Sequence, residues 1–381
     1  MSTGTRKRAP NAGERAREVA LLRWLATEDV RALRRALADP ASDPARFLRF
    51  AHRHKLGAFS YWALRRLGLT ETLSPAVVAA AKAGALRERS VNEKLTLQLR
   101  ELRDAFERSG AEVLFLKGPL FSQRFYGDID ARGVADIDIL SRREDVDRIE
   151  GVLLESGFER AFHVPVGRRM SRFFAHHFEY RRNALPLDLH WALQRHYSLR
   201  IDERRIWDTA SWIDCVGRTF RAPSAEYELV LQILGVVTDL QVGKLTLRPI
   251  VDIYRILRAV DRKLEWAEFF SWRERERTRR PSAFVLSFVL DVLDCAEEFP
   301  ELSALLQPMR ASLPRTSRAL SAALRSRPTA LGHKLLALRL YETPLAAAIS
   351  WWLVSLPFRF AVYGVTREPF DLARPRGRVH R

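Results

Sequence analysis

The sequence predicts an α+β protein in which a central region with strands lies between two helical regions. Apolar residues recur at helical spacing in residues 19–110 and again in residues 225–365. In residues 111–224 the apolar runs are shorter and alternate with polar residues, as strands do. With 381 residues, 47% of them hydrophobic, the chain can bury more than one core.

The first helical region is expected to follow a basic, polar tail at residues 1–18 and to end in a helix that leads into the first strand. Ser90 and Glu93 form a capping-box pattern that predicts the start of this helix, and Gly110 predicts its end. Four apolar residues share one helical face: Leu95, Leu99, Leu102 and Phe106.

The central region holds four apolar runs that predict strands, at residues 113–117, 135–140, 172–180 and 185–191. The last two runs flank a turn-forming segment at 181–184. Between the second and third runs a helix is expected at 142–156, with Ser141 and Glu144 as a capping box and Gly157 as its end.

The second helical region contains a helix that begins at Pro249 and carries an apolar stripe of Ile250, Ile253, Tyr254 and Leu257. Its last part, residues 345–365, is strongly apolar, but Pro357 and Arg359 interrupt it, and a membrane span needs about 20 apolar residues. A buried helix is the favoured interpretation, with peripheral membrane contact as the alternative. Residues 366–381 are expected to be a second basic tail.

The formal net charge is +18, yet specific binding of nucleic acid is not expected. The basic residues are 56 arginines and 8 lysines, interleaved with acids and with no run of five or more. They are typical of solvated helix faces. Cys215 and Cys295 lack disulfide or zinc spacing, and the first residues lack the apolar segment of a signal peptide, so a cytoplasmic location is predicted.

The run at 135–140 carries two acids, although it otherwise looks buried. Side chains alternate across a strand, so Asp136 and Asp138 share one face, and Ile137 and Ile139 share the other. Two neighbouring carboxylates repel each other unless a cation lies between them, and Mg²⁺ or Mn²⁺ is the expected ion. The alternative is a strand end in open water.

Two further features support a cation site. Gly118 ends the run at 113–117 and precedes a short helix that begins with Pro119, a geometry that suits a phosphate. Asp188 places a third carboxylate in the strand 185–191, with Leu187 and Leu189 expected to face the core. Three acids beside a glycine turn are typical of metal-dependent phosphoryl or nucleotidyl transfer.

Three more side chains are candidates for the same site. Lys117 could bind a phosphate or remain solvated, and Arg132 could bind phosphate, hold the aspartates or be a surface arginine. His190 shares the face of Asp188, where it could orient a metal ligand through a hydrogen bond, contact substrate or be structural.

Other polar residues are predicted to be structural. His176 and His177 are adjacent, so alternation turns them to opposite faces, and a metal role is not expected. Asp252 is expected to pair with an arginine rather than to close the cleft. No P-loop, dinucleotide-binding, H-E-x-x-H or G-x-S-x-G motif competes with the carboxylates.

The motifs together resemble the uncharacterised nucleotidyltransferase family of the DNA polymerase β-like superfamily. The likeness rests on Leu116-Lys117-Gly118, Tyr126, Arg132, Asp136 to Leu140, Gly157-Phe158 and Asp188 to Trp191. It covers residues 113–191 and extends weakly into 247–257. The glycine-serine pair usual in the superfamily is replaced here by Gly118-Pro119, which removes a hydroxyl and an N–H that could touch phosphate.

The resemblance implies a nucleotidyltransferase-like mixed sheet, with Gly118 at the phosphate turn and metal bound by Asp136, Asp138 and Asp188. The implied reaction moves a nucleoside monophosphate from a nucleoside triphosphate such as ATP to a hydroxyl of an acceptor that the sequence does not identify. The alternative is a catalytically silent module of the same fold that binds nucleotide or RNA.

Overall fold

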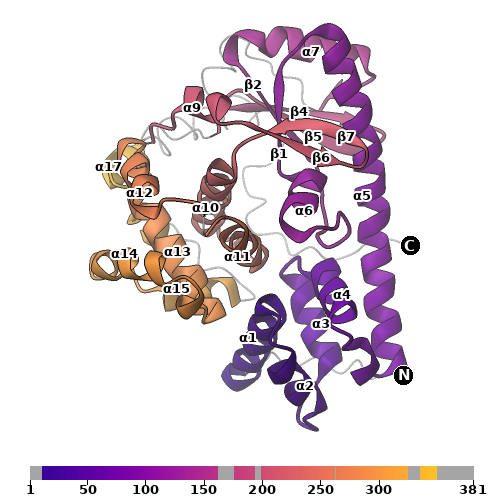
Figure 1. Ribbon diagram of the computed structural model, residues 1–381, viewed down its shortest axis with the longest axis vertical. Coiled ribbons are helices and arrows are strands. Elements are labelled where there is room, and N and C mark those ends of the chain that lie inside the picture. The colour runs from indigo at the N-terminus through magenta and orange to yellow at the C-terminus, as the bar shows by residue number, and fades with distance from the viewer. Residues whose placement is uncertain (1–10, 162–175, 194–198, 262, 325–334, 350–381) are drawn as a thin grey trace, which may run out of the picture.

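A computed structural model describes residues 11–161, 176–193, 199–261, 263–324 and 335–349. Its main sheet has five strands and lies between helices from both ends of the chain (Figure 1). The predicted α+β class is confirmed. The tails at 1–10 and 366–381 and most of the apolar segment 345–365 lie outside the described residues. Within the described ranges no helix combines the length and the apolar character needed to cross a membrane.

The first helix begins inside the segment 1–18, which composition alone predicts to be a tail. Helix α1 spans Ala12–Thr27. Asn11 and Glu14 form a capping box in which each side chain accepts a hydrogen bond from the other residue's backbone N–H, at 2.9 and 2.7 Å. The capping box stabilises the start of α1, and the buried residues later in the helix hold it against the core. Residues 12–18 are therefore helical. Three helices follow: α2 (Val30–Ala38), α3 (Pro44–Arg53) and α4 (Gly57–Arg66).

Helix α5 (Pro75–Ser109) has 35 residues and is roughly 50 Å long. It runs from the N-terminal helices to the sheet (Figure 1). The start predicted at Ser90 is wrong, because the helix begins at Pro75 and Glu93 forms an ion pair with Arg89 one turn earlier, at 2.8 Å. Its predicted end at Gly110, with φ of +63°, and the burial of its apolar face are confirmed.

The five-stranded sheet has the order β1-β2-β5-β4-β3, and β2 and β5 are its parallel pair. Its strands are β1 (Val113–Leu116), β2 (Ile137–Ser141), β3 (Glu159–Arg160), β4 (His177–Arg182) and β5 (Leu185–His190). Strands β4 and β5 form a hairpin around Asn183 and Ala184, which both have positive φ. The four predicted strands are therefore confirmed, with shifted ends.

Helix α7 (Val146–Glu155) follows β2 after a short 3₁₀ turn at Arg143–Asp145. Ser141 is the last residue of β2, and its hydroxyl donates to the carbonyl of His190 at 3.3 Å. The predicted capping box of Ser141 and Glu144 is thus wrong, because the sheet already uses the Ser141 side chain. The helix is followed by Gly157, with φ of +80°, as predicted.

The two faces of the sheet belong to different cores. Ile137, Ile139, Leu187 and Leu189 are fully buried against α5 and α7. Leu114, Leu116 and Leu140 face the opposite way and join a second core that includes α6 (Gly118–Tyr126) and the C-terminal helices.

The remaining elements begin with α9 (Glu203–Asp208) and the hairpin of β6 (Ser211–Cys215) and β7 (Arg218–Ala222). The C-terminal helices are α10 (Ala225–Val242), α11 (Arg248–Val260), α12 (Trp266–Arg275), α13 (Arg279–Leu293), α14 (Pro300–Arg310), α15 (Thr316–Leu324) and α17 (Pro344–Ile349). Their core is continuous with that of α1, α3 and α4, so helices from both ends of the sequence pack together. The division at residues 110 and 224 stays a prediction.

Candidate active site

The parallel pairing of β2 and β5 places two of the predicted acids side by side. Asp138 is in register with Asp188, and on the far side of β5 the antiparallel hairpin places Glu179 opposite Asp188. Because side chains alternate, all three carboxylates leave the same face of the sheet. That face is the one opposite α5 and α7.

Asp138 is buried and ionised. Burial alone would raise its pKa, but the Lys117 ammonium and a hydrogen bond with His190 outweigh burial and lower it to about 2. The distance from His190 Nε2 to Asp138 Oδ1 is 3.1 Å. Asp138 therefore keeps its negative charge at every physiological pH.

Asp188 has the opposite electrostatic character. Burial raises its pKa, and repulsion by Asp138, Asp136 and Glu179 raises it further, to about 8. One oxygen of Asp188, one oxygen of Asp138 and one ring nitrogen of His190 all lie within 4.8 Å of one another. Oxygen ligands held this close, with a charge that neighbouring acids oppose, suit a divalent cation.

Asp136 lies one residue before β2 and is partly buried. Burial and the charge of Asp138 raise its pKa, while Lys117 and Arg248 act in the opposite direction. Its oxygens are not among the atoms that come within 4.8 Å of both Asp138 and Asp188. The charge of Asp136 thus interacts with Asp138, although Asp136 lies further along the strand axis than the other two acids.

Lys117 and Gly118 form the turn between β1 and α6. Their φ angles are +47° and +62°, and a side chain at Gly118 would be strained in this conformation. An ideal Cβ at Gly118 would be 3.7 Å from the Asp136 carbonyl oxygen, so the turn lies directly against the acid-bearing segment. The Lys117 ammonium lowers the pKa of all three aspartates.

Arg132 makes its contacts away from the carboxylates of the sheet. Its Nε donates to both oxygens of Asp252 at 3.0 Å, and Tyr126 donates its hydroxyl to the same carboxylate at 2.7 Å. The guanidinium lies 4.9 Å from the ring centroid of Phe121. The predicted pairing of Asp252 with an arginine is confirmed, and Arg132 is a buried partner of α11 in this structure.

The loop that carries Arg132 is also fixed by Asn92 of α5, which is fully buried. Its amide nitrogen donates to the carbonyls of Ile129 and Arg132 at 2.8 and 2.9 Å, and its oxygen accepts from the Val134 N–H at 3.0 Å. Two helices, α5 and α11, therefore hold the segment that leads into Asp136.

Sequence reasoning missed His177, Glu179 and Arg248. His177 and Glu179 share the site face, and the register of the hairpin, centred on its two-residue turn, could have placed them opposite His190 and Asp188. Arg248 donates to the Gly133 carbonyl at 3.3 Å from the first turn of α11, which no local pattern reveals. The expectation that His176 points away is wrong, because His176 precedes β4 and escapes its alternation.

A family model described as an uncharacterised nucleotidyltransferase matches residues 40–294. A search of the curated proteins finds no match. Among solved structures, the chain is similar to "Crystal Structure of ANT(2")-Ia in complex with adenylyl-2"-tobramycin", with 15% identity and a TM-score of 0.34. That similarity covers 49% of this chain and 98% of the other.

Proposed function

This chain belongs to the uncharacterised nucleotidyltransferase family, and we propose that it moves a nucleoside monophosphate from a nucleoside triphosphate, such as ATP, to a hydroxyl of an acceptor. The observation that carries the proposal is the convergence of Asp138 and Asp188 on parallel strands beside the Lys117-Gly118 turn. Because neighbouring carboxylates repel, the pair requires positive charge, and the triphosphate of a nucleotide requires it as well.

The donor set fits Mg²⁺ or Mn²⁺. Asp138 and Asp188 supply closely spaced carboxylate oxygens, and Asp136 adds charge at one end. Asp138 and Asp188 would hold the cation directly, and Asp136 would support it through its charge. When bound, Mg²⁺ would neutralise charge on the phosphates and on the departing pyrophosphate.

The protein's own groups divide the remaining work. Lys117 and Gly118 would contact phosphate oxygens, since the charge of Lys117 acts on Asp138 and Gly118 lies against the Asp136 carbonyl at the start of α6. Arg248, whose charge reaches Asp136, is a further candidate for the phosphates. One aspartate of the cluster that lies near the acceptor would accept the proton of its hydroxyl.

Label transfer tests this proposal. Nucleoside triphosphates labelled at the α-phosphate are incubated with the full chain and Mg²⁺ or Mn²⁺, with sugars, aminoglycosides, peptides and RNA as acceptors, and pyrophosphate release is followed in parallel. We expect cation-dependent release that Asp188→Asn abolishes and that Asp208→Asn, an exposed aspartate on α9, leaves unchanged. Tight cation-dependent nucleotide binding without any release would contradict transfer and favour a silent binding module.

A further inference from the structure

Three histidine rings gather where the β4–β5 hairpin meets the candidate active site. His177 lies opposite His190 in the strand ladder, and their rings stack with centroids 5.0 Å apart. The ring of His176 is 4.4 Å from that of His177 and 5.6 Å from that of His190. Stacked rings alone would explain one pair, but not three rings that converge on one point.

The nitrogen atoms of His176 and His177 have the spacing of two ligands around a tetrahedral ion, and His190 lies close to them. His177 Nδ1 lies 3.4 Å from His176 Nδ1 and 3.3 Å from His176 Nε2. One nitrogen of each of the three rings lies within 4.8 Å of the others. Nitrogens bound to Zn²⁺ at about 2.0–2.1 Å in tetrahedral geometry are separated by roughly 3.3 Å. The cluster therefore needs only a small closure to surround an ion.

His190 is arranged as a metal-binding histidine usually is. Its Nε2 lies 3.1 Å from Asp138 Oδ1. Its Nδ1 is buried and makes no hydrogen bond with any residue that the structure describes. If Nε2 carries the proton and donates it to Asp138, the lone pair of Nδ1 is left for a ligand. A carboxylate that holds one imidazole nitrogen while the other binds metal is the common outer-shell arrangement.

We propose that His176, His177 and His190 form a second cation site, for Zn²⁺ or a similar borderline transition metal, distinct from the Mg²⁺ site of the aspartates. Imidazole ligands favour such ions, whereas Mg²⁺ favours carboxylates and water. Glu179 has an oxygen within 4.8 Å of a His177 nitrogen, so its carboxylate is available as a fourth ligand, while Asp188 remains a ligand of the Mg²⁺ site. Asp138 would link the two sites through its hydrogen bond with His190.

Zinc binding by the full chain tests the site directly. After EDTA treatment and desalting, the protein is titrated with Zn²⁺ against a coloured chelator, and with Co²⁺ while its visible absorption is recorded. We expect one Zn²⁺ per chain and the intense absorption of tetrahedral Co²⁺. His176→Ala and His177→Ala should each weaken Zn²⁺ binding by about 100-fold or more. His52→Ala, which removes an exposed histidine outside the cluster, should change nothing.

Two comparisons make the outcome decisive. Circular dichroism in EDTA shows whether a variant is folded, and His176→Asn replaces the alanine variant if that one is not. Asp136→Asn should lose Mg²⁺-nucleotide binding but keep Zn²⁺ binding, so failure of the proposed reaction and failure of the zinc site are told apart. Absence of Zn²⁺ binding in the wild type, or unchanged affinity in both cluster variants, would overturn the second site.

Discussion

Asp188 should make the stability of the metal-free protein depend on pH. Its pKa is raised from the ordinary value of 3.8 to about 8 by burial and by three neighbouring carboxylates. Between these two values the folded state holds a proton that the unfolded state has released, so stability falls as pH rises from about 4 to about 8. Urea unfolding across this range in EDTA measures the slope. Asp188→Asn should flatten it, and an equally steep slope in that variant would assign the effect to other groups.

Asn92 is expected to position Asp136 through the loop in front of β2. Asn92→Leu removes three hydrogen bonds and leaves two carbonyls and one N–H of the loop unsatisfied. We expect a loss of about 1–3 kcal/mol in the free energy of unfolding. Because the loop leads directly into Asp136, nucleotide affinity should fall as well. Thermal unfolding and nucleotide titration of the same sample measure both effects. The control is Gln98→Leu on the same helix, which also removes a buried side chain's hydrogen bond, here to the Arg182 carbonyl.

Individual residues also show what the sequence could and could not predict about the site. The shared face of Asp138, Asp188 and His190 could be predicted because alternation along a half-buried strand fixes the direction of each side chain. The direction of the His176 ring could not be predicted, because strand β4 begins one residue later and side-chain alternation does not apply to His176. The role of Arg132 depended on a partner 120 residues away on α11, which only the tertiary structure provides.

At the scale of elements, the buried ion pair of Arg132 and Asp252 joins the acid-bearing loop to α11. Removing one partner leaves an unpaired buried charge, so Arg132→Met or Asp252→Leu alone should cost about 3–5 kcal/mol of stability. The double variant should recover a large part of that loss, because both charges are then gone. A double-mutant cycle from denaturant unfolding gives the coupling. If Arg132→Met were as stable as the wild type but lost nucleotide binding, Arg132 would be a ligand and not a structural residue.

The elements that sequence patterns placed well are those with a continuous or regular apolar pattern. Strand β1 is an unbroken apolar run, β5 follows alternation, and the helix that begins near Pro249 carries a 3.6-residue stripe; the folded chain keeps each of these patterns. Helix starts were less accurate. Ser90 and Glu93 match a capping box, yet the helix continues through them because residues 76–89 contain six alanines and other strong helix formers, and the single Gly84 does not interrupt the helix. The capping-box pattern therefore gave a wrong helix start, because the preceding turns of the helix already accept and donate the backbone hydrogen bonds at this point.

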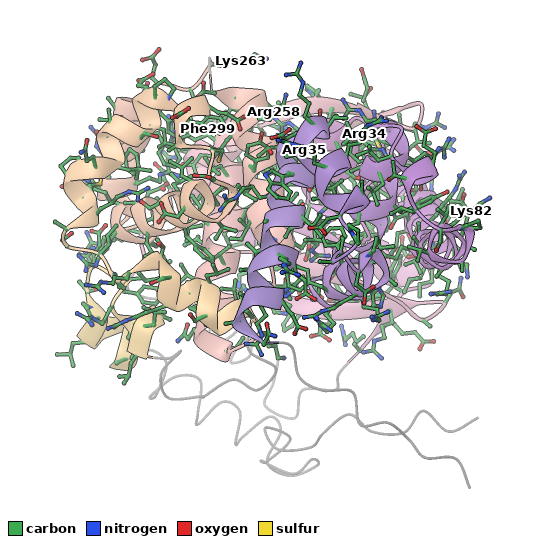
Figure 2. The ribbon with its side chains drawn as sticks, turned by 90° about the horizontal axis from the view of Figure 1, so that it is seen from below. Arg34, Arg35, Lys82, Arg258, Lys263 and Phe299 are labelled. Carbon is green, nitrogen blue, oxygen red and sulfur yellow. The ribbon has the colours of Figure 1, made fainter. Side chains whose placement is uncertain are left out.

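At the scale of the whole molecule, some of the basic side chains form ion pairs that join separate helices. Arg23 pairs with Asp294 at 2.8 Å and Arg46 with Glu18 at 2.9 Å, in each case joining separate helices. Figure 2 shows further basic side chains on one face: Arg34, Arg35, Arg258 and Lys263. All four side chains are exposed, which agrees with a solvated basic surface.

Binding of generic nucleic acid should accordingly be weak and sensitive to salt. We expect dissociation constants of about 10⁻⁴ to 10⁻⁶ M near physiological salt, with a steep loss of affinity as salt rises, because released counterions supply the free energy. Fluorescence anisotropy with labelled duplex and single-stranded oligonucleotides measures this. Nanomolar binding that depends on RNA sequence would contradict it and place RNA first among the acceptors.

The central claim is that the carboxylates of β2 and β5 bind a nucleotide through a divalent cation, and calorimetry tests it most directly. A nonhydrolysable triphosphate analogue is titrated into the wild type, Asp136→Asn, Asp138→Asn and the exposed control Asp208→Asn, with and without Mg²⁺. We predict Mg²⁺-dependent binding in the wild type and the control and its loss in both site variants. Asp136→Asn should be slightly more stable because like charges are relieved, whereas Asp138→Asn should fold but be less stable, because it loses the negative charge that Lys117 and His190 stabilise. Mg²⁺-nucleotide binding of unchanged affinity in Asp136→Asn and Asp138→Asn would contradict the account.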